Sequence, residues 1–517
     1  MKKGSQEKVN KKIFMPPAAL TLIIMIAGII TPSTLGEVTS MLLEKSTKYG
    51  GWIYVLGSFL LVVFCLYICF SHYGMIRLGG EDAKPEMSFF KWFCIVLTSG
   101  MAAGLCYWSV AEPIQTFVNP PIFSGVDGGS VRAAEQALRY SFMHWTLHPY
   151  AAYTSVGVVM GFLYWNKKRP FGIASGLYPI LGKRADGQLR YGINALCIFC
   201  LIAGLGTTIG LAVDQLAKGI NYISGKSYNV IVLGLIICVG FALIAIAVAC
   251  SGLHKGVAVV SRINMYLFII LLVFAFLFGG TLFILNNTIT SLGQYFQFFL
   301  SQSLYLEPVY QSGWVNNWTI FYLSWWLAFA PMIGLFQMKL AKGRTIREYI
   351  IVNLFAPCLF LVVWFGVFGS SAIEMTMNKT TAIVDAIEKY GNSVAFFAYL
   401  EQLPLKEILL VIAIIAVVLS IVTQTEAEIL TISDLCIEDD EEGAVSDRKA
   451  PAWIKIFWGL MMSLLAFALL NSGGLEAVQT ASVVFGLPML LLTLVICYGG
   501  VKALKENEKG GAADGEN

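Results

Sequence analysis

Long apolar stretches separated by short polar loops recur along almost the whole chain. A helix that crosses the hydrocarbon core of a bilayer needs about 20 mainly apolar residues, and stretches of that length indicate membrane-spanning helices. The pattern predicts twelve transmembrane spans, at residues 16–35, 52–72, 92–112, 140–164, 191–217, 228–250, 263–285, 318–338, 348–373, 407–432, 453–471 and 477–500.

The composition agrees with this pattern. Of the 517 residues, 57% are hydrophobic and 13% are charged, whereas a soluble domain has about 25% charged residues. The first apolar stretch is too long for the hydrophobic region of a signal peptide, so it is assigned as the first span. The chain is therefore expected to be an all-α integral membrane protein in contact with lipid, and its net charge of +3 suggests no nucleic-acid partner.

The basic residues predict an orientation. An even number of spans places both termini on one side, and with that side assigned to the cytoplasm, about three quarters of the 35 Lys and Arg residues fall in cytoplasmic segments. The excess follows the positive-inside rule. A multi-pass protein of the cell (plasma) membrane with both termini in the cytoplasm is expected.

Two spans contain helix-breaking residues at comparable depths. Gly100 and Gly104 flank Met101 in the third span, and Pro331 and Gly334 lie in the eighth. Lipid tolerates unpaired backbone groups only where they line a cavity or are buried in protein. Interrupted helices at matching places in two halves indicate the binding site of an inverted-repeat transporter. Glycines that only permit close helix packing remain the alternative.

The interruptions predict two inverted five-helix repeats, formed by spans 3–7 and spans 8–12. The expected organisation is a cytoplasmic N-terminal tail (1–15), two peripheral transmembrane helices (16–72), the first repeat (73–285), an extracellular connection (286–317), the second repeat (318–500) and a disordered cytoplasmic tail (501–517).

Aromatic residues gather near both interruptions. Trp325, Trp326 and Phe329 occupy positions i, i+1 and i+4, so they can share one helix face. Aromatic faces bind cations such as quaternary ammonium groups, which have no N–H to donate. Further aromatics are Tyr107 in the third span and Trp145, Tyr150 and Tyr153 in the fourth. Membrane-interface belts and core packing are the alternative roles for such residues.

Four sequence blocks make the chain resemble the betaine/carnitine/choline transporter (BCCT) family. They are YGMIRLGGEDAKPEMSFFKW, GMAAGLCYWSVAEP, HWTLHPYAAY and FYLSWWLAFAPMIGLFQMKLAKGRTIREYI. The resemblance implies a twelve-helix fold with an inverted repeat, a homotrimer, and transport of a solute such as glycine betaine, carnitine or choline. It also implies a central substrate site at Met101, Tyr107, Trp145, Tyr150, Tyr153, Trp325, Trp326 and Phe329, with Trp318 on the path that leads to it.

The chain departs from the family pattern in the aromatic cage and in the residues of ion coupling. Tyr150 and Phe329 stand where Trp is commoner, a difference expected to reshape the cage and hence its choice of substrate. Leu201 and Leu205 stand where sodium-coupled members have threonines. The residues left as candidates for cation or proton coupling are Thr207, Thr208, Thr423, Thr425 and Glu426. Sodium-independent exchange and cation symport of the same solutes both remain open.

Other chemistry is not expected. His144 and His148 have the i, i+4 spacing of a zinc pair, but no carboxylate is evident to complete a site. Cys197 and Cys200 lie in an apolar stretch and are expected to pack, Asp214 to pair with Lys218, and Glu428 to be solvated. No catalytic set, metal or cofactor is predicted, so an enzyme is not expected. A membrane-embedded osmotic sensor or enzyme is the alternative class.

Overall fold

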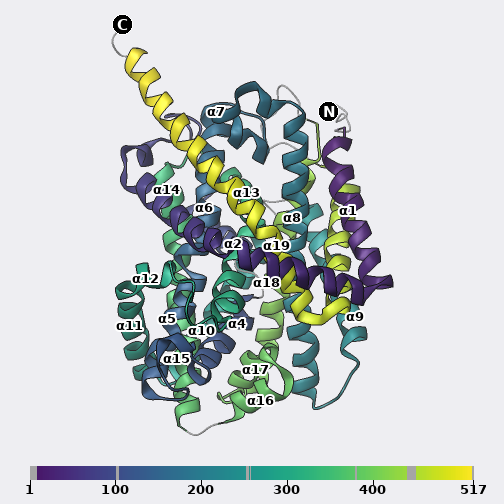
Figure 1. Ribbon diagram of the computed structural model, residues 1–517, viewed down its shortest axis with the longest axis vertical. Coiled ribbons are helices and arrows are strands. Elements are labelled where there is room, and N and C mark those ends of the chain that lie inside the picture. The colour runs from purple at the N-terminus through teal and green to yellow at the C-terminus, as the bar shows by residue number, and fades with distance from the viewer. Residues whose placement is uncertain are drawn as a thin grey trace.

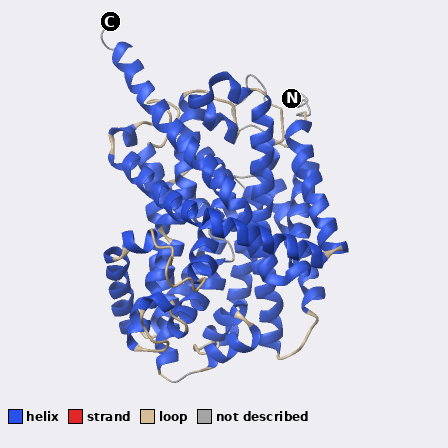
Figure 2. Ribbon diagram, viewed as in Figure 1, coloured by secondary structure: helices blue, strands red, loops and turns tan. Residues whose placement is uncertain are grey.

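The chain folds almost entirely into helices. The computed structural model describes residues 8–100, 104–251, 256, 258–378, 381–438 and 450–514, and in these ranges it contains no strand, only two isolated β-bridges (Figure 2). The helices are α1 (Lys11–Ile30), α2 (Pro32–Phe70), α3 (Phe89–Gly100), α4 (Gly104–Val118), α5 (Val131–Trp145), α6 (Leu147–Gly161), α7 (Tyr178–Leu181), α8 (Gln188–Ser224), α9 (Val230–Ser251), α10 (Ala258–Phe278), α11 (Thr281–Gln297), α12 (Phe299–Ser303), α13 (Phe321–Lys339), α14 (Ile346–Ile350), α15 (Ala356–Met377), α16 (Ala382–Tyr390), α17 (Ala395–Leu400), α18 (Lys406–Leu435) and α19 (Ala452–Asp514).

The helices are long and apolar enough for a membrane. In the described part of the chain ten segments meet that requirement, or eleven if α3 and α4 form one bent span. The apolar window of α13 is entirely buried, whereas those of α9 and α10 are mostly exposed. α13 therefore lies at the centre of the bundle, and α9 and α10 present an apolar surface suited to lipid. The prediction of an all-α integral membrane protein is confirmed.

The sequence predicts twelve spans, and eleven segments are found in the described part of the chain when α3 and α4 count as one. The missing segment is the predicted span 140–164. It is divided at Thr146 into α5 and α6, whose fifteen residues each are too few to cross a bilayer alone. Pro149 explains the break, because it has no N–H to bond to the carbonyl of Trp145 and its ring crowds that carbonyl. Proline is tolerated in the first turn of α6, so the new helix starts at Leu147.

The two predicted interruptions have different outcomes. The axes of α3 and α4 differ by 63°, while Met101 between them lies outside the described residues. The interruption expected at Pro331 is wrong, since α13 runs through this proline without a break. Gly334 serves helix packing, because a Cβ there would lie 2.8 Å from the carbonyl oxygen of Tyr153 on α6.

Two loops that carry the resemblance are joined by main-chain hydrogen bonds. Residues 76–78 pair with 343–346 through an antiparallel bridge between Arg77 and Thr345, with Leu78 N donating to Arg344 O at 2.9 Å. The Arg77 guanidinium also donates to the Gly343 carbonyl oxygen at 2.6 Å. These motifs therefore hold the loop before α3 against the loop after α13.

α19 contains the last two predicted spans. It turns sharply near Gly474, whose φ of +62° suits glycine. The helix then continues to Asp514, so the expectation of a disordered tail from residue 501 fails over its described part. Lys502 and Glu506 are one turn apart, and Glu508 accepts a hydrogen bond from Tyr73 at 3.2 Å.

The predicted extracellular connection 286–317 contains helices. α11 begins after Gly280, inside the predicted seventh span, and α12 follows. The start of α1 and the end of α19 lie at the same end of the molecule as α7, whereas α16 and α17 lie at the opposite end (Figure 1). This arrangement agrees with two termini on one side.

We expect single cysteines at Lys168 and Glu388 to be labelled from opposite faces by a membrane-impermeant thiol reagent. Both positions are exposed, and Cys250, the one exposed native cysteine, is replaced by Ser in the background. Because basic loops stay in the cytoplasm, Lys168→Cys should react only after permeabilisation, and Glu388→Cys in intact cells. Labelling of Lys168→Cys in intact cells would overturn the orientation.

Candidate substrate-binding site

Six of the predicted aromatic side chains pack together at the centre of the bundle. Trp145 meets Trp326 edge-on with ring centroids 5.2 Å apart, and Trp326 stacks on Trp325 at 5.6 Å. Tyr153 lies 5.9 Å from both Trp326 and Phe329. All six are buried. They come from α5, α6 and α13 and are called the aromatic cluster: Trp145, Tyr150, Tyr153, Trp325, Trp326 and Phe329.

The ends of α3 and α4 lie directly against this cluster. A Cβ at Gly104 would be 2.8 Å from the Trp325 ring and 3.1 Å from the Trp145 ring. A Cβ at Gly100 would be 3.5 Å from the Tyr153 ring. The glycines thus let the interrupted helix approach the aromatic faces, and a side chain at Gly104 would displace rings.

The other predicted aromatics lie to one side of the cluster. Tyr107 is buried next to Trp108, with centroids 4.7 Å apart. Trp318 is partly buried, 5.8 Å from Trp108 and 6.2 Å from Trp314. Trp318 therefore stands between the cluster region and a cavity that Trp314 lines.

Each indole N–H of the cluster donates to a different helix. Trp325 donates to the Thr208 hydroxyl of α8 at 3.1 Å, and Trp326 to the His144 carbonyl oxygen of α5 at 3.1 Å. Trp145 donates to Oε2 of Glu112 on α4 at 2.8 Å. The rings are therefore fixed in orientation, with the Trp325 ring stacked against both Trp326 and Phe321.

The hydroxyls of Tyr150 and Tyr153 have no hydrogen-bond partner among the described residues. Both are fully buried. A buried hydroxyl without a partner is costly, so a polar ligand group would find two available donors here.

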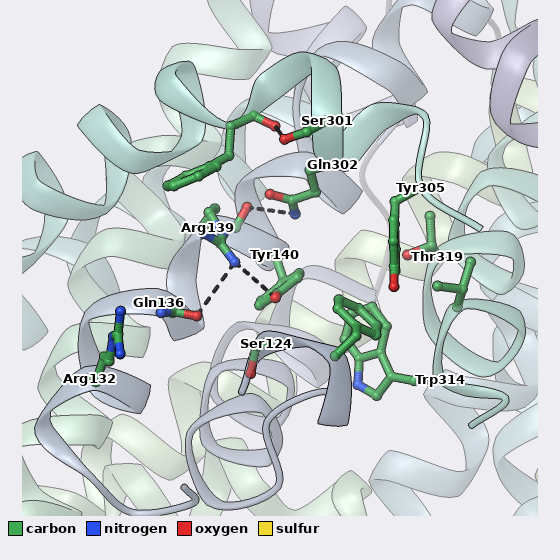
Figure 3. A pocket seen from close by; sticks show the side chains of 13 residues that line it. Ser124, Arg132, Gln136, Arg139, Tyr140, Ser301, Gln302, Tyr305, Trp314 and Thr319 are labelled. Atoms are coloured by element: carbon green, nitrogen blue, oxygen red, sulfur yellow. Dashed lines mark hydrogen bonds between the residues drawn. The ribbon is translucent and has the colours of Figure 1, made fainter. Parts of the chain in front are cut away.

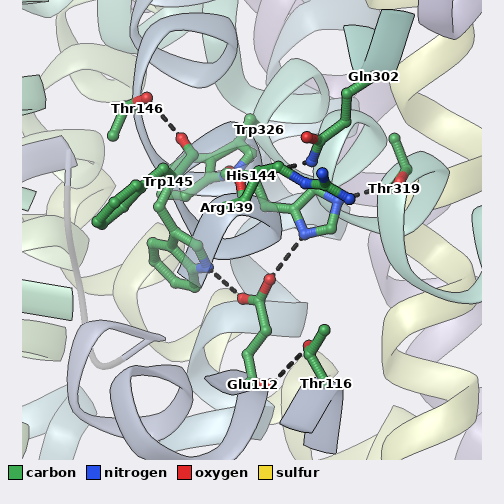
Figure 4. Close-up of polar contacts among 10 residues, drawn as sticks. Glu112, Thr116, Arg139, His144, Trp145, Thr146, Gln302, Thr319 and Trp326 are labelled. Atoms are coloured by element: carbon green, nitrogen blue, oxygen red, sulfur yellow. Dashed lines mark hydrogen bonds and ion pairs between the residues drawn. The ribbon is translucent and has the colours of Figure 1, made fainter. Parts of the chain in front are cut away.

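Glu112 joins the cluster to His144, a contact the sequence did not reveal. Its Oε1 lies 2.7 Å from Nδ1 of His144, whose Nε2 lies 3.0 Å from the Thr319 hydroxyl (Figure 4). Both side chains are fully buried. The carboxylate that seemed to be missing beside His144 is thus present. An ionisable residue at the end of the third span was the available signal.

A cavity of about 370 Å³ lies beside this network. Its wall combines arginines with aromatic rings, as Arg132, Arg139, Tyr140, Tyr305 and Trp314 show (Figure 3). The Arg139 guanidinium lies 4.8 Å from the ring centroids of Tyr140 and Phe298. Thr319 borders the cavity and contacts His144. The cavity is therefore connected to the aromatic cluster through Thr319, His144 and Glu112.

The coupling candidates on α8 and α18 each have partners of their own. Thr207 bonds to the Val478 carbonyl oxygen at 2.5 Å and to Ser482 at 2.6 Å, both on α19, and Thr208 accepts from Trp325. On α18, Thr423 donates to the carbonyl oxygen of Ser420 at 2.9 Å. The threonines of α8 are therefore engaged in helix packing and with the aromatic cluster.

Glu426 and Glu428 are both fully buried on α18. Their four carboxyl oxygens have no hydrogen-bond partner among the described residues. The expectation that Glu428 is solvated is wrong, because neighbouring helices cover this end of α18. Thr425 is also buried.

The remaining predictions concern pairs. Asp214 and Lys218 form the expected ion pair at 2.9 Å, and Cys197 and Cys200 are buried free thiols. Among the described residues no three His, Cys, Asp or Glu side chains are grouped to hold a metal ion. In the same residues His148 has no hydrogen-bond partner and does not join His144 and Glu112.

The chain is thus a bundle of helices long and apolar enough to span a membrane, with aromatic rings packed at its centre. A model of the betaine/carnitine/choline family of transporters matches residues 12–509. The chain therefore belongs to this family, and it is a transporter rather than an enzyme.

Curated relatives match over nearly the whole chain. It is 33% identical to a probable glycine betaine transporter of Desulfitobacterium hafniense, over 98% of this chain and 100% of the relative. It is 32% identical to an osmo-independent choline transporter of Acinetobacter baylyi (96% and 94%). It is also 32% identical to an ectoine/hydroxyectoine transporter of Virgibacillus pantothenticus (99% and 100%).

Replacing Thr208 with Val should loosen the aromatic cluster. Valine keeps the shape of the side chain but removes the acceptor of the Trp325 indole, and a buried donor without a partner costs about 1–3 kcal/mol. We expect Thr208→Val to lower the thermal unfolding midpoint in detergent and to alter tryptophan fluorescence, while Thr208→Ser retains both. Identical midpoints for the two variants would show that this bond does not hold the ring.

Proposed function

We propose that this protein is a secondary transporter of a trimethylammonium-type solute such as glycine betaine, carnitine or choline, and that the aromatic cluster is its substrate site. The observation that carries the proposal is the convergence of the six rings on the interrupted helix formed by α3 and α4. A cation with four carbon substituents is bound best by aromatic faces in a site without water.

The polar groups around the cluster suit the rest of such a solute. The free hydroxyls of Tyr150 and Tyr153 can donate to a carboxylate or exchange hydrogen bonds with an alcohol. Relatives named for glycine betaine, choline and ectoine match at nearly equal identity, so identity alone does not choose the solute. Met101 is proposed to complete the site together with Tyr107.

Alternating access follows from the proposed repeats, formed by spans 3–7 and 8–12. The solute is proposed to pass through the cavity beside Arg139 and past Trp318. At the opposite end, Lys339 of α13 and Asp434 of α18 form a partly buried ion pair at 2.6 Å. We propose that this pair closes the cytoplasmic side, with both termini in the cytoplasm and the protein assembled as a homotrimer.

For the energetics we propose exchange of solutes or an unusual cation site. Sodium prefers oxygen ligands, but Leu201 and Leu205 are apolar and the Thr207 hydroxyl is already bonded to α19. Thr423, Thr425 and Glu426 of α18 are the proposed oxygen ligands of such a site. Glu426 is then either a cation or proton site or a structural group.

Replacing Trp325 or Trp326 with Leu should weaken solute binding by about 1–3 kcal/mol, because a cation–aromatic contact and its packing are both lost. Quenching of tryptophan fluorescence by glycine betaine, carnitine or choline measures the affinity. Trp52→Leu, at an exposed position of α2, is the matched control and should bind as the unmodified protein does. Unchanged affinity in both cluster variants would refute the assignment of the site.

Uptake into proteoliposomes tests the energetics. We expect strong stimulation by internal solute and little by an inward sodium gradient. Glu426→Gln should leave exchange largely intact if the carboxylate is structural, since glutamine keeps the shape and removes the charge. Uptake that depends steeply on sodium and is indifferent to internal solute would contradict the proposal and would assign sodium ligation to Thr207 and Thr208.

A further inference from the structure

Glu112 contacts the aromatic cluster at the indole N–H of Trp145. Its Oε2 accepts a hydrogen bond from the Trp145 indole at 2.8 Å, and Trp145 in turn meets Trp326 and lies 6.2 Å from Trp325. The carboxyl group therefore touches the rim of one cluster ring rather than its face. Among the described carboxylates, Glu112 is the one that hydrogen-bonds to a ring of the cluster.

Both oxygens of the Glu112 carboxyl group have a hydrogen-bonding partner. The Trp145 indole N–H can only donate, so Oε2 accepts from it. Oε1 lies 2.7 Å from Nδ1 of His144, whose Nε2 lies 3.0 Å from the Thr319 hydroxyl. These contacts place the carboxyl group at the edge of the Trp145 ring.

The neighbouring lysine and arginine side chains are paired elsewhere. The Arg139 guanidinium lies 4.8 Å from the ring centroids of Tyr140 and Phe298, and its terminal nitrogen donates to the Tyr140 hydroxyl at 2.9 Å. Lys339 pairs with Asp434 at the far end of α13. No described Lys or Arg forms an ion pair with Glu112, so His144 is its basic partner among the described residues.

We propose that Glu112 is a positioning and polarising residue whose charge gives the aromatic cluster its preference for a cationic group. The attraction between a cation and an aromatic ring is electrostatic. A carboxylate bonded to the indole N–H raises the electron density of the Trp145 ring and also attracts the ligand charge directly through a medium of low dielectric constant. The inference rests on the proposed function, since it concerns the same site.

The test compares two ligands that differ only in charge. Choline and its carbon isostere, in which a quaternary carbon replaces the nitrogen, have almost the same shape, and their affinities are measured by tryptophan fluorescence on the purified full-length protein. Glu112→Gln retains an oxygen to accept from Trp145 and removes the charge. We expect the affinity of this variant for choline to fall by about tenfold or more. This is the effect of removing a unit charge about 7 Å from the ligand cation at an effective dielectric constant of about 20. The affinity for the neutral isostere should stay within about twofold.

Glu307→Gln is the matched control. Glu307 is also buried and accepts two hydrogen bonds, from Ser312 at 2.5 Å and from the Val315 amide at 3.0 Å, but it does not contact the cluster. Its affinities for both ligands should match those of the unmodified protein. If Glu112→Gln does not fold, Glu112→Asp serves instead, because it withdraws the charge from the indole and should show a smaller but still selective loss for choline.

The outcomes separate the inference from the proposed function. If the ratio of the choline affinity to the isostere affinity is unchanged in the Glu112 variants, the polarising role is refuted and Glu112 has only a structural role. An equal loss of affinity for both ligands leads to the same conclusion. If the unmodified protein binds none of choline, glycine betaine and carnitine better than the carbon isostere of that solute, the aromatic cluster is no cation site and the proposed function itself fails. The ratio is independent of the fraction of active protein, so partial misfolding does not imitate either result.

Discussion

The site depends on the hydrogen bonds that fix three indole rings inside a medium without water. Each N–H of Trp145, Trp325 and Trp326 would be costly if left alone in the bundle, and each is satisfied by an acceptor on another helix. These bonds orient the rings and join α4, α5, α8 and α13. The same constraint that stabilises the fold therefore presents the aromatic faces in one arrangement.

Small residues make this arrangement possible. Gly100 and Gly104 bring the ends of α3 and α4 within contact of the aromatic cluster, and Gly334 brings α13 against the backbone of α6. Association of helices in lipid relies on such close packing, because there is no hydrophobic gain from leaving the bilayer. The interruption between α3 and α4 and the close approach of α13 to α6 both bring backbone and aromatic rings together at the centre of the bundle.

The buried carboxylates of α4 and α18 are of two kinds, with and without hydrogen-bond partners. Glu112 is fully partnered through Trp145 and His144, whereas Glu426 and Glu428 have no partner among the described residues. A partnered carboxylate is a fixed element of the site. Carboxylates without partners are expensive inside a membrane protein, so they are usually retained for a ligand, an ion or a proton. The proposed positioning role of Glu112 on α4 uses a carboxylate of the first kind, and the proposed coupling role of Glu426 on α18 uses one of the second kind.

Much of the architecture was decided by the sequence because lipid permits few alternatives. Backbone groups in a bilayer must be satisfied within the chain, so each long apolar stretch became a helix, and Pro149 divided the fourth stretch because a proline lacks an N–H. Residue type also supplied the aromatic faces of Trp145, Tyr153, Trp325 and Trp326, which are proposed here to bind a cation that has no N–H to donate. The sequence left open how each helix is rotated against its neighbours. That rotation buried Glu428, turned Thr208 toward Trp325 and paired Glu112 with His144. These contacts join residues far apart in the chain, and they were decided only when close packing selected one relative setting of the helices.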